Sequence, residues 1–441
     1  MLFSSFESVL NKYSPSPRQI VLAFSGGVDS RVMLELLCVY RDTHPQHEYL
    51  LVHVHHGLSS NADSWVSLCE RWADDSAMPI HIERVTLKKE GESLENAARQ
   101  ARYDAIAKHL KPGAILLTGQ HADDQVETFF LALKRGSGPA GLAAMPESRQ
   151  FSNGTLVRPL LHVRRQDIVS FAEQQGLDWI EDESNQDSRF DRNFLRNEIL
   201  PGLSARWPGF HKAVKRTITL CSEQESVIDE LIVGKMNEIV WPDGSLDLAG
   251  LSWNSRQVAQ QIVRRWIKQE ACIVPSQAQL LELFDSVIPA AEDANPLLGI
   301  GEWQIRRFQG RLYLVHQVKD ISLWQSYLSL SQVTELPDGL GMLSLFPKAG
   351  GNLRLPVNGE TVRVMFEPSG LSAKPVGRGG SRKLKKLFQE YGVPSWLRRR
   401  TPIVLFGDEV AAVAGLFVTD HGSGNQCDLL WHKSGYTTVN R

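Results

Sequence analysis

The stretch IVLAFSGGVDSRVMLELL, residues 20–37, joins an apolar run to a helical pattern through the six-residue loop SGGVDS. The apolar run predicts a buried strand, and the apolar residues after Asp29 recur at helical spacing. Gly26 and Gly27 allow backbone N–H groups to turn inward, and the start of the following helix adds partial positive charge. A strand, a glycine loop and a helix in this order predict a phosphate-binding site.

The composition of this loop excludes two common nucleotide sites. The loop has no lysine and does not have the G-x-G-x-x-G spacing, so it is neither a γ-phosphoryl-transfer loop nor a dinucleotide fingerprint. Ser25 and Ser30 supply hydroxyl donors, and Asp29 is placed to cap the helix or to orient a metal ion. We therefore assign nucleotide binding to the whole loop, namely Ser25, Gly26, Gly27, Val28, Asp29 and Ser30.

Outward from the loop, residues 20–118 alternate short β-rich runs with helical patterns. This rhythm predicts a twisted parallel sheet with crossover helices on both faces, an α/β fold. Ligands of such folds bind at the carboxyl ends of the strands, near the point where the strand order reverses. Residues 25–30, 56–57 and 118–124 all follow predicted strands, so we expect these three segments to line one crevice.

The remainder of the chain has a different character. A length of 441 residues suggests two to three domains. Residues 216–300 carry amphipathic helical patterns, one of them opened by a Ser276-x-x-Gln279 capping box. Later residues form short β-rich runs separated by Gly and Pro. We predict an α/β domain at 1–215, a small helical domain at 216–300 and a β-rich α+β domain at 301–441.

Composition limits the compartment and the cofactors. No apolar run reaches the roughly 18 residues of a membrane span, and the first residues lack a secretory pattern, so we expect a cytoplasmic protein without a membrane partner. Five scattered cysteines form no C-x-x-C pair, which argues against zinc, iron–sulfur and dithiol redox sites.

One strongly basic segment of the chain indicates nucleic-acid binding. The net charge of −2 argues against a wholly basic coat protein, yet residues 374–400 hold nine Lys or Arg and a single Glu. Basic side chains release counterions from an RNA backbone, and interleaved aromatic residues stack on bases or form a small core. We assign RNA contacts to Lys383, Lys385, Lys386, Arg398, Arg399 and Arg400.

The stretch TGQHADDQVETFFLALKRGSG, residues 118–138, places His121, Asp123 and Asp124 at the start of a predicted helix. Helix capping explains one of these two carboxylates but hardly both. Carboxylates that face a bound triphosphate can hold Mg²⁺ or recognise an ammonium group. We assign catalytic roles to His121, Asp123, Asp124 and Asp29, and metal binding to Asp29 and Asp123.

Two further segments carry polar residues. Arg99 and Arg102 lie about one turn apart on a predicted helix, where a solvated face is the alternative to a binding role. Residues 185–197 form a dense polar set without the spacing of a packed helix, and its alternative is a surface ladder of ion pairs. A catalytic or recognition loop explains this set better, and it supplies Arg192, Asn193 and Arg196.

The loop SGGVDS resembles the pyrophosphate loop (PP-loop) of the ATP pyrophosphatase superfamily, whose members split ATP between the α and β phosphates. The string HADDQVET with RGSG resembles the signature of the tRNA(Ile)-lysidine synthetase family. The segments HHGLSSNADSW, LENAARQARYDAI, 158–203 and 383–415 fit the same family. His55 departs from the Asp or Asn that members often carry, and 217–300 match only in helical character.

This resemblance implies that the wobble cytidine of an isoleucine tRNA is adenylated by ATP with Mg²⁺ and then joined to L-lysine. It implies nucleotide binding by His56 and Arg99, charge stabilisation by Arg192 and Arg196, and lysine binding or proton transfer by Asp124 and His121. Arg102 and Asn193 are expected to contact tRNA, whose anticodon and acceptor regions are both gripped. Other PP-loop enzymes and a non-catalytic tRNA-binding protein stay open as alternatives, as do a monomer and a homodimer.

Overall fold

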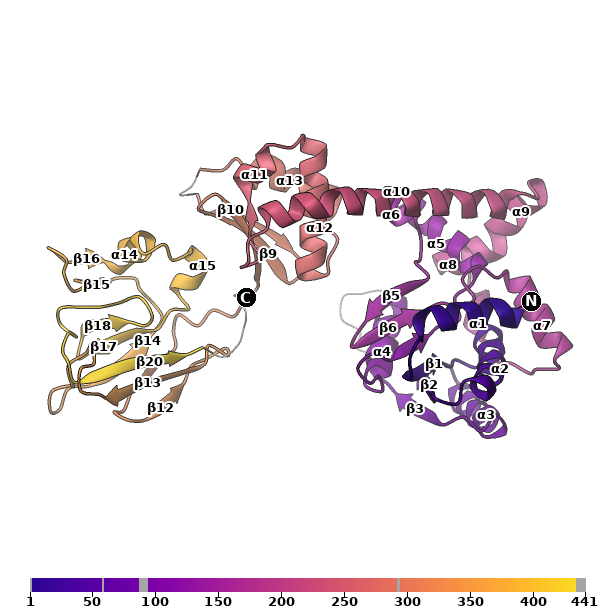
Figure 1. Cartoon of the computed structure of the whole chain (residues 1–441), viewed down its shortest axis with the longest axis horizontal. Coiled ribbons are helices and arrows are strands. Elements are labelled where there is room, and N and C mark those ends of the chain that lie inside the picture. Colours follow the sequence, from indigo (N-terminus) through magenta and orange to yellow (C-terminus); the bar gives the residue numbers. More distant parts are fainter. Residues whose placement is uncertain (1, 58, 87–93, 292–293, 434–441) are drawn as a thin grey trace. The chain divides into compact units, whose positions relative to one another are not determined.

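The computed structural model describes residues 2–57, 59–86, 94–291 and 294–433. The chain divides into two compact units, Met1–Asp229 and Glu230–Arg441, and Figure 1 shows both. Within the described chain, no helix combines the length and the apolar character that crossing a membrane requires.

The first unit is built on a six-stranded sheet in the order β3-β2-β1-β4-β6-β5. Its strands are β1 (Gln19–Ala23), β2 (Glu48–His55), β3 (Ile80–Arg84), β4 (Ile115–Leu117), β5 (Ser148–Phe151) and β6 (Gly154–Val157). All neighbouring pairs are parallel, as predicted, except β5 and β6 at one edge. This hairpin was not predicted; its turn places Ser152 at a φ of 49° before Asn153 and Gly154.

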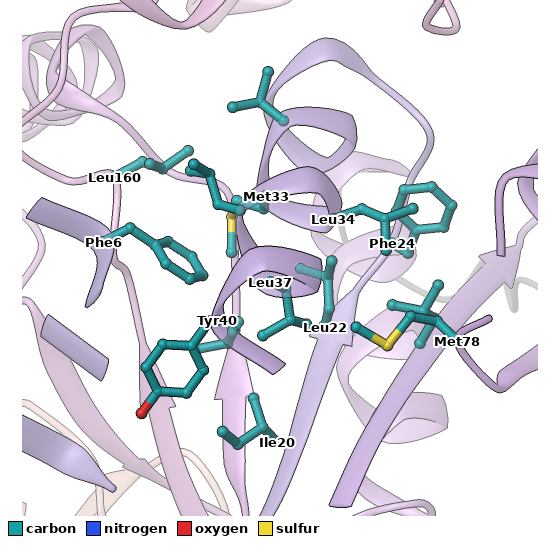
Figure 2. Close-up of a cluster of buried hydrophobic side chains, with 14 of the residues drawn as sticks. Phe6, Ile20, Leu22, Phe24, Met33, Leu34, Leu37, Tyr40, Met78 and Leu160 are labelled. Atoms are coloured by element: carbon teal, nitrogen blue, oxygen red, sulfur yellow. The ribbon is translucent and has the colours of Figure 1, made fainter. Parts of the chain in front are cut away.

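Helices cover both faces of the sheet, which confirms the α/β prediction. One face carries α1 (Leu2–Tyr13), α2 (Val28–Thr43), α3 (Ala62–Asp75) and α7 (Arg165–Gln174), and the other carries α4 (Leu94–Ala107). Because side chains alternate along a strand, Ile20 and Leu22 face the first group while Val21 faces α4. Figure 2 shows Leu34 and Leu37 of α2 packed over Leu22.

Further helices complete the first unit. They are α5 (Ala122–Lys134), α6 (Pro139–Leu142), the 3₁₀ turn η1 (Glu183–Gln186), α8 (Asp191–Phe194), the π turn η2 (Leu195–Ile199) and α9 (Leu200–Arg206). The long helix α10 (Phe210–Ile239) begins in this unit, where Val214 and Ile218 pack with Val126 and Leu200. The first compact unit ends at Asp229, within α10.

The second unit begins with helices and a small sheet. The helices are α11 (Leu248–Ser252), α12 (Arg256–Ala271) and α13 (Gln277–Glu282), which continues in the π turn η3 (Leu283–Val287). The predicted capping box of Ser276 and Gln279 opens α13. The antiparallel sheet has the order β7-β10-β9-β8, with β7 (Leu246–Asp247), β8 (Leu297–Ile300), β9 (Trp303–Phe308) and β10 (Arg311–His316). Its β8–β9 hairpin spans residue 300, where the helical domain was predicted to end.

The C-terminal part is β-rich with two short helices, as predicted. Its strands are β11 (Gln325–Tyr327), β12 (Val333–Glu335), β13 (Met342–Pro347), β14 (Val362–Met365), β15 (Ser372–Ala373), β16 (Arg382–Lys383), β17 (Ile403–Phe406), β18 (Glu409–Val413), β19 (Phe417–Val418) and β20 (Cys427–His432). Its helices are α14 (Leu384–Glu390) and α15 (Ser395–Arg398). The α14 side chains Leu384, Leu387 and Phe388 are fully buried against β17 and β18.

Candidate functional site

The loop after β1 is held by its own serines. Ser30 Oγ accepts the Gly26 N–H and donates to Gly27 O, both at 3.0 Å, and it lies 3.1 Å from Ser25 Oγ. Gly26 has a φ of 82°, in the left-handed region that glycine tolerates. Helix α2 begins at Val28, so the N–H groups of its first turn have no partner within the helix and are available to an anion.

A close approach of neighbouring side chains explains why position 26 is glycine. An added Cβ there would collide with Ile180 Cδ1 and lie 2.9 Å from Cys69 Sγ. The Ile180 N–H also donates to Gly26 O at 2.9 Å, which joins the segment after α7 to the loop. The loop shape thus depends on residues more than forty positions away in the sequence.

The predicted crevice exists as a cavity of about 1260 Å³ at the carboxyl ends of the strands. It is lined by residues of the loop after β1, of 52–62 at the end of β2 and beyond it, of 118–124 after β4, of α4 and of 179–197, and by Arg165. Because β1 and β4 are neighbours while the chain leaves β1 towards β2, this is the point where the strand order reverses. The three segments named from the sequence therefore meet, and the polar 179–197 segment adds one wall.

His121 organises the carboxylates at the start of α5. The side chain is 2 % exposed, and it caps the helix with Nδ1 accepting the Asp124 N–H at 3.4 Å while Asp124 Oδ2 accepts the His121 N–H at 3.0 Å. His121 Nε2 lies 3.4 Å from Asp124 Oδ2 and 3.7 Å from Asp29 Oδ1. With Nδ1 accepting, a neutral ring carries its proton on Nε2, towards both carboxylates.

Asp29 is the carboxylate that is best suited to a cation. Burial raises the pKa of Asp29 above its ordinary value, while His121 opposes this shift. Its Oδ1 is buried without a hydrogen-bond partner. The described residues contain no group of three or more His, Cys, Asp or Glu side chains able to hold a metal ion. A Mg²⁺ site with one or two carboxylates plus substrate phosphates needs no such group, so an unsatisfied Asp29 oxygen fits that ion.

Asp123, the second predicted metal ligand, already has a partner. Asp123 Oδ2 accepts the Arg165 N–H at 2.8 Å, at the start of α7, and lies 3.8 Å from His121 Nδ1. Both carboxylates of the Asp123–Asp124 pair thus accept hydrogen bonds from helix N-termini, Asp124 within α5 and Asp123 across to α7. Helix capping was expected to explain only one of these two carboxylates, but each of them accepts a hydrogen bond at the start of a helix.

A buried ion pair behind the cavity wall was missed from the sequence. Glu127 is 1 % exposed, and Arg196 donates to it from Nε at 2.7 Å and from Nη2 at 3.0 Å, while Arg196 Nη2 also lies 3.4 Å from Asp124 Oδ1. Burial raises the pKa of Glu127 above its ordinary value, and the hydrogen bonds from Arg196 oppose this shift only in part. The spacing in the sequence could have indicated this residue, because Glu127 follows Asp124 by three residues and therefore lies on the same face of the helix.

Arg192 is less fully paired than Arg196. Its Nε lies 3.6 Å from Glu127 Oε2 and has no hydrogen bond, although its Nη2 donates to Thr128 Oγ1 at 3.4 Å. Both arginines line the cavity. Asn193 also lines it, and its side chain donates to the carbonyl oxygens of Ser184 and of residue 187, which shapes the wall itself.

The other predicted ligands, His56, Arg99 and Arg102, also line the cavity. Arg99 and Arg102 of α4 are exposed, and Arg99 lies with its Cζ 5.1 Å from the centre of the Tyr103 ring. His56 is half-buried with Nδ1 unpartnered, and burial lowers its pKa. Within the matched segments, Leu58 and the side chain of Glu95 lie outside the described residues.

The predicted RNA-contact residues of the second unit divide into two kinds. Arg400 pairs with Asp338 at 2.9 Å and Arg399 with Glu367 at 2.9 Å, while Arg398 Nε donates to a backbone carbonyl. Lys383, Lys385 and Lys386, here called the lysine group, are exposed and form no ion pair with any described residue. Among the described residues the lysine group thus has no ion-pair partner, whereas Arg400 has one within the fold.

Comparison with known proteins agrees with this arrangement. A PP-loop domain model matches residues 2–203, a TilS substrate binding domain model matches 246–313, and a TilS substrate C-terminal domain model matches 362–433.

Two similar relatives are both described as tRNA(Ile)-lysidine synthase. The protein of Vibrio campbellii is 49% identical over 444 residues, covering 98% of this chain and 99% of the relative. The protein of Photobacterium profundum is 51% identical over 433 residues, with the same coverage. With the glycine loop lining this cavity and both halves of the chain matched, this chain belongs to the tRNA(Ile)-lysidine synthase family of ATP-dependent ligases.

Proposed function

We propose that this chain converts the wobble cytidine of an isoleucine tRNA to lysidine in the cytoplasm, using ATP and L-lysine. The C2 oxygen of cytosine attacks the α-phosphorus and pyrophosphate leaves. The lysine ε-amine then attacks C2, and the bond from C2 to oxygen breaks as AMP leaves. The observation that carries this proposal is that the glycine loop, the unsatisfied Asp29 oxygen and several arginines line one cavity. These arginines are Arg99, Arg102, Arg192 and Arg196.

The phosphate loop receives the leaving pyrophosphate. Ser25–Ser30 offer the unpartnered N–H groups of the first turn of α2, and His56 and Arg99 flank the nucleotide. Asp29 would hold Mg²⁺, with the remaining oxygen of Asp123 as a further ligand. When bound, the ion neutralises charge on the phosphates.

Amine activation is assigned to the carboxylates at the start of α5. Asp124 binds the lysine ammonium group and accepts its proton, while His121 holds Asp124 and Asp29 in place from the buried side. Arg192, whose Nε has no hydrogen bond, and Arg196 stabilise charge at the α-phosphate.

We further propose that residues 1–215 form the catalytic domain and that 216–300 and 301–441 grip the tRNA. The lysine group, which has no ion-pair partner in the described structure, contacts its backbone, while Arg102 and Asn193 approach the unstacked anticodon base. A monomer or a homodimer is compatible with this division.

The direct test incubates the full chain with isoleucine tRNA, ATP and L-lysine and measures the mass of the anticodon nucleosides. We expect the wobble cytidine to gain the mass of lysine less one water molecule, together with release of AMP and pyrophosphate. An unchanged cytidine, with ATP consumed or not, refutes the proposal.

A further inference from the structure

Arg165 is a cation of the cavity wall that no assigned role uses. It is half-buried at the first residue of α7, lines the cavity, and its guanidinium has no hydrogen bond or ion pair to any described residue. Its neighbour Arg164 differs, because it pairs with Asp167 at 2.7 Å and does not line the cavity. Because no described protein group accepts from this guanidinium, its N–H groups are available to an anionic ligand in the cavity.

The start of α7 is held firmly against the start of α5. The Arg165 N–H donates to Asp123 Oδ2 at 2.8 Å, and the Ala122 N–H donates to Val163 O at 2.8 Å. These two hydrogen bonds fix where the Arg165 side chain leaves the backbone. Asp123 therefore acts on this side chain through the backbone of residue 165.

The backbone of Arg165 is linked to the phosphate-loop end of the cavity through Asp123 and His121. Asp29 stands in the first turn of α2, directly after the glycine loop. The His121 ring lies between Asp29 and Asp123, 3.7 Å from Asp29 Oδ1 and 3.8 Å from Asp123 Oδ2, and this Asp123 oxygen accepts the Arg165 N–H. Arg165 and the loop to which phosphates are assigned line the same cavity. The phosphates of ATP are thus favoured over the carboxylate of the amino acid.

We propose that Arg165 is a further nucleotide-binding residue whose guanidinium contacts phosphate oxygens of ATP, and that Asp123 is a positioning residue for it. The planar fork of a guanidinium matches two phosphate oxygens. The inference rests on the proposed use of ATP at this site, but it does not depend on which substrate is adenylated.

The test measures binding of ATP and of adenosine to the full chain by calorimetry, in buffer without Mg²⁺. We expect Arg165→Ala and Arg165→Gln to weaken ATP binding about tenfold or more and to leave adenosine binding unchanged. Arg164→Ala is the matched control and keeps the affinity for ATP. Unchanged ATP binding in both Arg165 variants, or an equal loss for adenosine, overturns the assignment.

The positioning role of Asp123 is tested by a pair of variants in the same titration. Asp123→Ala removes the acceptor of the Arg165 N–H and weakens ATP binding, whereas Asp123→Asn keeps an amide oxygen as acceptor and restores it. Equal losses in both variants overturn the positioning role. If the full chain forms no lysidine while Arg165→Ala still weakens ATP binding, the proposed function fails and the Arg165 assignment stands.

Discussion

Replacement of Gly26 by alanine tests how the phosphate loop is held. The left-handed backbone at a φ of 82° costs a non-glycine residue roughly 1–2 kcal/mol. The new methyl group also meets Ile180 and Cys69, and overpacking of this kind costs about 1–3 kcal/mol. We expect Gly26→Ala to lower the free energy of unfolding of the first unit by about 2–5 kcal/mol.

Gly113→Ala is the matched control. Gly113 also has a positive φ, 75°, but a Cβ there would meet nothing within 4 Å, so only the backbone cost applies. The difference between the two variants isolates the collision with Ile180 and Cys69, about 1–3 kcal/mol. With a denaturant slope of about 2 kcal/mol per molar urea, the unfolding midpoints should differ by roughly 0.5–1.5 M.

The assay is urea unfolding followed by tryptophan fluorescence. Because the chain has two compact units, the transition of the first unit is identified as the one that ATP shifts to higher urea in the wild-type chain. Equal midpoints for Gly26→Ala and Gly113→Ala would refute the reasoning, since they would mean that Ile180 and Cys69 do not confine the loop.

Three further predictions concern charge. In metal-free buffer the stability of the wild-type first unit should fall relative to that of Asp29→Asn as pH rises from about 4 through the raised pKa of Asp29, which urea titrations of both proteins measure; parallel pH profiles contradict this. Replacing the lysine group by alanines should weaken tRNA binding and make the slope of log affinity against log salt shallower by about 2–3, whereas Arg400→Ala should leave the slope unchanged in filter binding. Glu127→Ala should cost about 3 kcal/mol in urea unfolding, because it leaves the Arg196 guanidinium without its main partner; an unchanged midpoint contradicts this.

Local pattern was enough for much of the architecture. The strand before Ser25, the helix after Asp29 and the capping box at Ser276 each depend on a few neighbouring residues, so spacing and residue type revealed them. The β5–β6 hairpin was missed because four-residue strands carry little periodicity. Its S-N-G turn is the signal that was available.

The roles within the site were harder to predict, because hydrogen bonds between distant segments decide them. From the sequence, Asp123 and Asp124 look alike, yet Asp124 closes a capping box within its own helix while Asp123 accepts from α7. In the same way, Arg399 and Arg400 cannot be told from the lysine group in the sequence, because all of them are basic residues of the same segment. Only the folded chain supplies their partners, Glu367 and Asp338.

The sequence by itself determined the type of site, because a glycine loop between a strand and a helix presents N–H groups to a phosphate whatever surrounds it. The tertiary structure alone decided which charges remain available to ligands. Burial and long-range partners neutralise Glu127 with Arg196, leave one oxygen of Asp29 unsatisfied and leave Arg165 facing the cavity. Those outcomes depend on which segments become neighbours when the sheet forms, and pairing over long sequence separations leaves no periodic pattern in the sequence.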